Sequence, residues 1–193
     1  MVLSGRKIEK KFTYGDYVTW PENERWELID GEAYDMTPSP KRIHQKVSGA
    51  FFAILWNYLK GKTCEVYDAP FDVRLPKGKE KSEEIDSVVQ PDIVVICDPK
   101  KLDDAGCRGA PDLIVEILSP GTAAKDIIKK RDLYERHKVK EYWLVHPTDK
   151  IVTVYIYKPG KGYGKPAVYC SEDKLVPYIF PDLTIDLKDV FPA

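Results

Sequence analysis

The sequence predicts an α/β (α+β) fold in which helices lie against a mixed central β-sheet. Residues 92–97 and 113–118 are apolar runs of strand length, as expected for strands covered on both faces. Residues 40–60 instead repeat apolar side chains at helical spacing. A helix, several strands, a second helix and a further strand follow one another, which predicts helices packed on a sheet.

The first segments predict a short helix and a β-hairpin. Residues 13–20 are expected to be helical up to Pro21, because proline does not continue a helix. The strand-like segments 26–29 and 33–36 flank Asp30-Gly31, a dipeptide that favours tight hairpin turns.

The longest helix is expected over residues 40–60. Ser39-Pro40 resembles a helix cap followed by a first-turn proline. The apolar residues that recur along this helix are Ile43, Val47, Ala50, Phe51, Ile54 and Tyr58. Their spacing predicts an amphipathic helix.

Strands and one helix fill the rest of the chain. Segments 64–67 and 71–75 are strand candidates, and a charged loop over 76–84 follows them. A second helix should begin at Thr122 or Asp126 and reach about His137, and the strands expected after it are 141–145 and 151–157, paired as a hairpin.

Length and composition predict one compact domain over residues 1–193, with its core at about 13–160. No apolar run approaches the roughly 20 residues that span a bilayer, and no apolar signal core follows the basic N-terminus. We therefore expect a cytoplasmic protein without a membrane segment. Cys64 and Cys97 lie in apolar strand-like stretches, where we expect them to be reduced.

The net charge of −1 argues mildly against a protein that wraps nucleic acid. Positive charge is nevertheless concentrated after residue 124, at Lys125, Lys129, Lys130, Arg131, Arg136, Lys138 and Lys140. Charge alone leaves open whether this is a solvated helix face or a nucleic-acid contact.

Glu116 is a carboxylate in the centre of an apolar strand. Burying an unpaired carboxylate is costly, so proteins pair it, protonate it or give it a metal ion. Two interpretations stay open: a buried ion pair with Arg131 or Lys130, or a metal site.

Strand geometry selects the partner of Glu116 in a metal site. Asp112 lies on the same strand, but four residues at about 3.3 Å each separate the two backbones by about 13 Å. Asp92 lies beside Glu116 if strands 92–97 and 113–118 pair antiparallel. Oxygen ligands without a cysteine or histidine cluster favour Mg²⁺ or Mn²⁺ over zinc.

Six segments in order carry a family resemblance: residues 26–32, 39–40 with His44, 90–94, 115–120, Asp126 with Lys130 and Tyr134, and 141–145. The chain resembles the bacterial Uma2 (DUF820) type of restriction-endonuclease-like proteins, within the PD-(D/E)XK nuclease superfamily. The resemblance runs from about Thr13 to Pro147 and implies a restriction-endonuclease-like core.

The resemblance implies that Asp92 and Glu116 are the acidic metal ligands. The superfamily pattern places a lysine two residues after the second acid, and this chain has Leu118 there. Lys130 on the next helix occupies the position to which this family displaces the lysine. Arg131 remains a rival for the cationic role.

A helical wheel puts Lys130 beside Ile127 and Tyr134, on the flank of the buried stripe, with Lys129 pointing outward. By resemblance, Glu27 is an additional acidic residue that binds the metal or positions water, and His44 contacts a phosphate or orients a carboxylate.

The resemblance implies metal-dependent endonuclease action on phosphodiester bonds, expected in DNA, with a homodimer suited to two cuts in a duplex. A binding module that keeps the fold and does not cut is one alternative. Another metal hydrolase on the same scaffold is a further one.

Overall fold

A central six-stranded sheet organises the computed structural model, which describes residues 10–36, 41–119 and 123–191. Its strand order is β12-β11-β10-β9-β6-β3. These strands are β3 (Glu65–Asp68), β6 (Ile93–Ile96), β9 (Leu113–Ile117), β10 (Glu141–His146), β11 (Ile151–Ile156) and β12 (Ala167–Cys170). β9 and β10 run parallel and the other neighbours antiparallel, so the predicted mixed sheet is confirmed.

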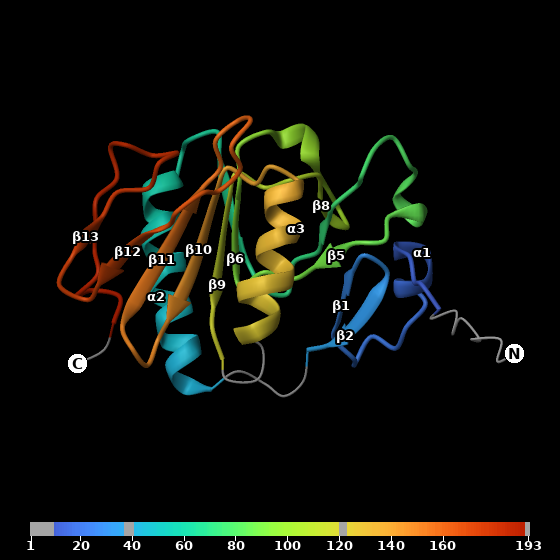
Figure 1. Cartoon of the computed structure of the whole chain (residues 1–193), viewed down its shortest axis with the longest axis horizontal. Coiled ribbons are helices and arrows are strands. Elements are labelled where there is room, and N and C mark those ends of the chain that lie inside the picture. Colours follow the sequence, from blue (N-terminus) through green and yellow to red (C-terminus); the bar gives the residue numbers. More distant parts are fainter. Residues whose placement is uncertain (1–9, 37–40, 120–122, 192–193) are drawn as a thin grey trace, which may run out of the picture.

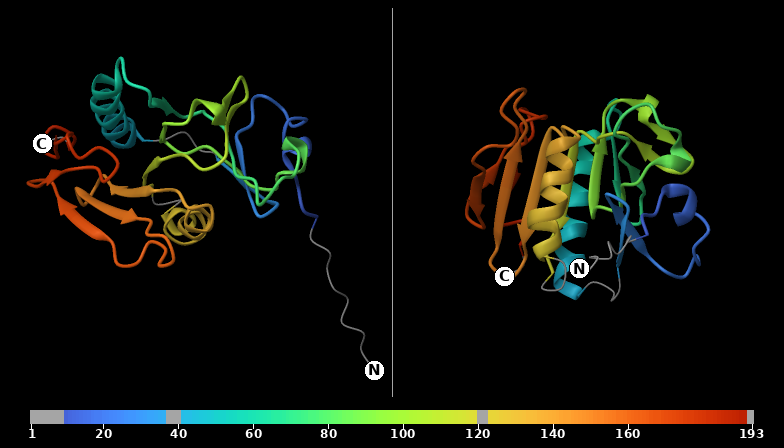
Figure 2. Two further views of the ribbon diagram at one scale, coloured as in Figure 1. Left: turned by 90° about the horizontal axis from the view of Figure 1, so that it is seen from above. Right: turned by 45° about the vertical axis from the view of Figure 1, so that its right-hand side comes forward.

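Helices cover both faces of this sheet (Figures 1 and 2). The predicted long helix is α2 (Arg42–Leu59), and its apolar side packs on one face. The second predicted helix covers the opposite face as two segments, η3 (Lys125–Lys130) and α3 (Arg131–Arg136).

Strand β9 divides its side chains between the two resulting cores. Leu113, Val115 and Ile117 belong to the core under α2, whereas Ile114 belongs to the core under α3. Because side chains alternate along a strand, Glu116 shares the face of Ile114 and points toward η3 and α3.

A second six-stranded sheet, order β2-β1-β5-β4-β8-β7, was not predicted. Its strands are β1 (Trp26–Ile29), β2 (Glu32–Asp35), β4 (Val73–Arg74), β5 (Val88–Val89), β7 (Leu102–Asp103) and β8 (Gly106–Arg108). Four of them have two or three residues, too few to show a period in sequence. The expected hairpin is β1-β2, and its turn has positive φ at both Asp30 (51°) and Gly31 (80°).

The remaining elements are short: α1 (Tyr14–Tyr17), η1 (Ser82–Glu84), η2 (Pro99–Lys101), β13 (Lys174–Leu175) and β14 (Ile185–Asp186). The predicted caps Ser39-Pro40 and Thr122 lie outside the described residues. Within the described ranges, no helix has both the length and the apolar character needed to cross a membrane.

The expectation of reduced cysteines is wrong for Cys64 and Cys97, which form a disulfide. The pair Glu65–Ile96 ends the β3–β6 ladder, and one step further along the same register lie the two cysteines. They are 33 residues apart in sequence, so only the strand register brings them together.

Candidate active site

Asp92 and Glu116 meet across two neighbouring strands. β6 and β9 pair antiparallel with Ile93 opposite Val115, so continuing this register by one residue places Asp92 opposite Glu116. The backbone N–H of Ile117 donates to Asp92 Oδ2 at 2.7 Å, which fixes the carboxylate against β9. The antiparallel pairing expected from the sequence is therefore confirmed.

Asp112 lies at the opposite end of β9 and serves a different purpose. Its Oδ2 accepts the backbone N–H of Cys97 at 2.8 Å, and its Oδ1 lies 2.6 Å from Lys140 Nζ. Both oxygens have protein partners away from Glu116, as the strand-length argument required.

Glu116 is 4% exposed and has one engaged and one open oxygen. Its Oε1 accepts from Lys130 Nζ and from the Tyr134 hydroxyl, each at 2.8 Å. No described residue donates to Oε2. Burial raises the pKa of Glu116 to about 8; Lys130 opposes this rise, while the nearby carboxylates of Asp126 and Asp92 add to it.

Lys130 is 1% exposed and contacts three carboxylates. Its Nζ lies 2.6 Å from Glu27 Oε1, 2.8 Å from Glu116 Oε1 and 3.5 Å from Asp126 Oδ1. Burial alone would lower the pKa of Lys130, but the three carboxylates raise it well above its usual value. The side chain is therefore an ammonium group at neutral pH.

Glu27 is fully buried and has both oxygens engaged. Oε1 accepts the Gln90 backbone N–H at 3.0 Å in addition to contacting Lys130, and Oε2 accepts from Lys125 Nζ at 2.6 Å. Burial would raise the pKa of Glu27, yet the two lysines lower it overall. Glu27 is therefore an ionised anchor for Lys125 and Lys130, and it does not line the cavity described below.

A wide helical turn brings these two lysines to one carboxylate. Segment η3 is π-helical, so its hydrogen bonds join residues five apart and Lys130 lies above Lys125 on the same side. The regular helical wheel, which placed Ile127 beside Lys130 on the flank of the buried stripe, is therefore wrong for Ile127. This side chain is 37% exposed. Arg131, the rival cation, pairs instead with its neighbour Asp132.

His44, at the start of α2, reaches the other carboxylate. Its Nε2 lies 3.2 Å from Asp92 Oδ2, the oxygen that also accepts from Ile117. The buried Nδ1 of His44 has no hydrogen-bond partner in the described part of the chain. Asp92 Oδ1 receives no hydrogen bond from a described residue, so this oxygen remains available to a ligand.

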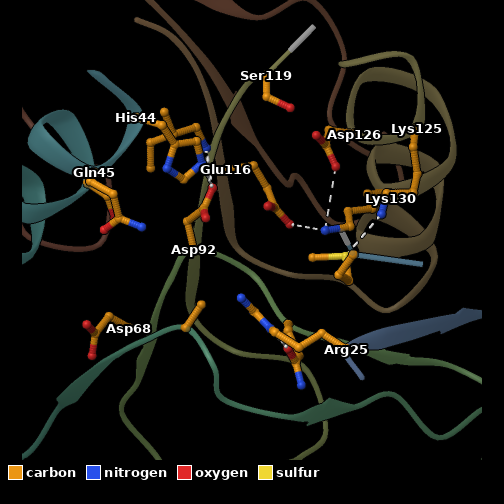
Figure 3. A pocket seen from close by; sticks show the side chains of 15 residues that line it. Arg25, His44, Gln45, Asp68, Asp92, Glu116, Ser119, Lys125, Asp126 and Lys130 are labelled. Atoms are coloured by element: carbon orange, nitrogen blue, oxygen red, sulfur yellow. Dashed lines mark hydrogen bonds and ion pairs between the residues drawn. The ribbon is translucent and has the colours of Figure 1, made fainter. Parts of the chain in front are cut away.

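These groups surround a cavity of about 130 Å³ (Figure 3). Its lining residues that matter for charge are the acids Asp68, Asp92, Glu116 and Asp126 and the cations Arg25, Lys125 and Lys130. The four carboxylates outnumber the three permanent cations. The volume accommodates several water molecules or an ion with part of a ligand.

The residues present fit a hard divalent ion. Among the described residues, no group of three or more His, Cys, Asp or Glu side chains forms a metal cage. Magnesium, however, is usually bound by one or two carboxylates and completes its shell with water and substrate phosphate. Asp92 Oδ1 and Glu116 Oε2 are two such oxygens on neighbouring strands that line the cavity.

The structure brings all five site residues expected from the sequence into one neighbourhood: Asp92, Glu116, Lys130, Glu27 and His44. Sequence reasoning did not assign a role to Tyr134, Lys125 or Arg25. The tyrosine did stand in a family segment four residues after Lys130, the spacing of neighbours on one helix face, and this was the available signal.

Comparison with known proteins gives three consistent matches. The profile of the family described as "Uma2: Putative restriction endonuclease" matches residues 14–188. The uncharacterized protein slr1290 of Synechocystis sp. is 28% identical over 148 residues, which cover 75% of this chain and 74% of that protein. The crystal structure of a putative nuclease belonging to DUF820, from Anabaena variabilis, aligns with a TM-score of 0.73 and 20% identity, covering 93% of this chain and 97% of that one. The structural match supports a nuclease-like fold.

Proposed function

The chain belongs to the Uma2 family of restriction-endonuclease-like proteins, and on that basis we propose that it is a metal-dependent endonuclease that hydrolyses phosphodiester bonds in DNA. The observation that carries this proposal is the opposition of Asp92 and Glu116 across β6 and β9, with the buried Lys130 ammonium 2.8 Å from Glu116. The nuclease descriptions of the family and of its structural relative agree with it.

In this proposal, Asp92 and Glu116 hold Mg²⁺ or Mn²⁺ through their open oxygens. A bound divalent ion supplies the polarisation of the scissile phosphate and lowers the pKa of an attacking water. His44 acts as a positioning residue, because its contact with Asp92 Oδ2 turns the other oxygen of that carboxylate toward the cavity.

In this proposal, Lys130 provides the positive charge that the PD-(D/E)XK pattern normally takes from a lysine two residues after the second acid. Leu118, at the usual lysine position, is buried in the apolar core under α3 and supplies no charge. Since its carboxylate neighbours hold Lys130 protonated, we assign it stabilisation of the negative charge that develops on the phosphate and not removal of a proton from water. Glu27 acts through Lys130, as a positioning residue.

Cleavage of plasmid DNA tests the proposal. The protein should nick or linearise plasmid in the presence of Mg²⁺ or Mn²⁺ and lose this activity with EDTA. Asp92→Asn and Glu116→Gln should each abolish it, because each removes a charged ligand oxygen. Asp149→Asn is the control, since Asp149 is an exposed carboxylate that does not line this cavity, and it should leave cleavage nearly unchanged.

Cleavage that survives both Asp92→Asn and Glu116→Gln would reject this site. Salt-dependent DNA binding by the unaltered protein without any cleavage would favour the alternative, a module that binds nucleic acid on the same fold. The homodimer and the choice of DNA over RNA stay predictions, for which sedimentation analysis and cleavage of matched DNA and RNA duplexes are the respective tests.

A further inference from the structure

We propose that Arg25 is a phosphate-binding residue of this cavity, held in place by Gln90, so that it clamps a backbone phosphate of the nucleic acid beside Asp92 and Glu116. The inference rests on the proposed function for the identity of its ligand. Its own basis is a set of side-chain hydrogen bonds among Arg25, Gln90, Tyr17 and Asp72.

Gln90 presents a fixed carbonyl oxygen to Arg25. Its side-chain Nε2 donates to the Tyr17 hydroxyl at 3.0 Å and to Asp72 Oδ1 at 2.9 Å, and Tyr17 itself donates to Asp72 Oδ1 at 3.0 Å. A carboxylate can only accept here, so the amide nitrogen must face Asp72. The amide oxygen of Gln90 then necessarily faces Arg25.

That oxygen holds one edge of the guanidinium group. Gln90 Oε1 accepts from Arg25 Nε at 3.1 Å and from Nη2 at 2.9 Å. Gln90 is 8% exposed, and its backbone N–H is anchored on Glu27, so the support is rigid. A guanidinium has five N–H donors in a planar fork, and the described residues engage only the Nε–Nη2 edge. The Nη1–Nη2 edge can therefore meet two phosphate oxygens.

Arg25 also differs from the neighbouring lysines in its ion pairing. Lys125 pairs with Glu27, and Lys130 pairs with Glu27 and Glu116. Arg25 contacts a neutral amide and, in the described part of the chain, no carboxylate forms an ion pair with it. A half-buried arginine that lines a cavity without a counter-ion favours an anionic ligand.

The ligand should bind together with a divalent ion. Carboxyl oxygens of Asp92 and Glu116 lie in the same cavity, so a phosphate entering alone meets repulsion that one arginine offsets only partly. An ion between Asp92 and Glu116 removes that repulsion. Arg25 and the ion would then contact the same phosphate or two consecutive phosphates. Both cations would offset the negative charge of the bound phosphate.

The test compares anion binding by the unaltered protein, Arg25→Ala and Arg25→Lys. Fluorescence anisotropy of a labelled DNA duplex is measured across a range of salt concentrations with Ca²⁺ present, and a gel confirms that the duplex is intact. Thermal melting with added pyrophosphate and Mg²⁺, compared with Mg²⁺ alone at the same ionic strength, gives a second readout that needs no DNA. Arg108→Ala is the matched control, an exposed arginine outside the cavity whose Nη2 donates to Glu80 O at 2.7 Å.

Arg25→Ala should weaken duplex binding about tenfold and reduce the slope of log affinity against log salt by about one. Arg25→Lys should keep the slope and lose most of the affinity, because an ammonium group cannot replace the planar fork. Arg108→Ala should match the unaltered protein. Pyrophosphate should raise the melting temperature of the unaltered protein and leave that of Arg25→Ala unchanged.

Duplex binding and pyrophosphate stabilisation that are both insensitive to Arg25→Ala, in a variant that still melts cooperatively, would overturn the inference. So would an unaltered protein that binds neither probe. If pyrophosphate binds through Arg25 but no duplex is bound or cut, the anion site is supported and the proposed endonuclease function is what fails.

Discussion

Two groups of polar side chains at the cavity differ in how completely their charges and hydrogen-bonding atoms are paired. The inner cluster consists of Glu27, Glu116, Asp126, Lys125 and Lys130, on β1, β9 and η3. The outer rim consists of Arg25, His44 and Asp92. In the inner cluster Lys125 contacts one carboxylate and Lys130 contacts three, whereas each member of the rim keeps an atom without a described partner.

This difference assigns different roles to the two groups. Removing one partner from a buried ion pair leaves an uncompensated charge, so the inner cluster fixes geometry and is costly to disturb. We expect the rim to contribute less to folding, because Arg25 and Asp92 are only partly buried and Arg25 has no ion-pair partner among the described residues. Glu116 connects the two, since Oε1 belongs to the cluster and Oε2 remains open. We expect substitutions to separate into effects on stability and effects on ligand binding.

The largest effect on stability should come from Lys130→Ala. The variant leaves Glu27 and Glu116 buried without their shared cation, which should cost about 3–5 kcal/mol in free energy of unfolding. Urea denaturation measures it. The neighbouring Lys129→Ala is the control: its side chain is 48% exposed and pairs with Glu32 at 3.0 Å, so the change should stay within about 1 kcal/mol.

A double substitution separates structure from catalysis at the same position. Glu27→Gln combined with Lys130→Met removes one negative and one positive charge together, so it should recover part of the stability lost in Lys130→Ala. It should remain inactive, because no cation is left beside Glu116. Restored plasmid cleavage in this folded double variant would contradict the role assigned to Lys130.

On the rim, Asp92→Asn should abolish binding of Mn²⁺, measured by isothermal titration calorimetry, with little change in urea stability. The amide keeps the shape of the side chain but replaces a charged oxygen ligand. Equal Mn²⁺ affinity in Asp92→Asn and the unaltered protein would place the metal elsewhere.

His44→Ala should have a smaller effect on the same measurement. Groups that orient a metal ligand typically change metal affinity about 10–100-fold when they are removed. His44 lies at the start of α2 and contacts Asp92 Oδ2, so the loss of Mn²⁺ affinity should fall in that range. A variant that binds Mn²⁺ normally would show that Ile117 alone orients Asp92.

Tyr134→Phe should give the smallest change in Mn²⁺ affinity. It removes one hydrogen bond to Glu116 Oε1, which still contacts Lys130, and the aromatic ring keeps its edge contact with Tyr142. Hydrogen bonds to charged groups contribute roughly 1.5–3 kcal/mol, so the urea midpoint should shift modestly. Mn²⁺ affinity should change less than in His44→Ala.

The main strands of the central sheet could be predicted because they are long enough to appear in the sequence as continuous apolar runs. A carboxylate in an apolar strand identified Glu116, and antiparallel register then selected Asp92, a local rule that the structure obeys. An ion pair of Glu116 with Lys130 or Arg131 was one of the two interpretations left open by the residues alone, and the structure shows the pair with Lys130. The choice of Lys130 over Arg131 followed only from family resemblance, since no periodicity joins residues on different elements. The extent of the single domain remains a prediction.

What the sequence missed depends on contacts between distant segments. Arg25 and Gln90 are 65 residues apart, and nothing in their own neighbourhoods indicates that one supports the other. The π-helical turn of η3 is a second example, because a regular wheel cannot place Lys125 and Lys130 on the same carboxylate. The Cys64–Cys97 disulfide likewise depends on strand register.

Anomalous diffraction from crystals soaked in Mn²⁺ tests the central claim most directly. We predict a single anomalous peak in the cavity, ligated by Asp92 Oδ1 and Glu116 Oε2 at about 2.0–2.6 Å, with Lys130 still bound to Glu116 Oε1. A cavity without a peak, or a peak that is ligated by neither carboxylate, would contradict the account.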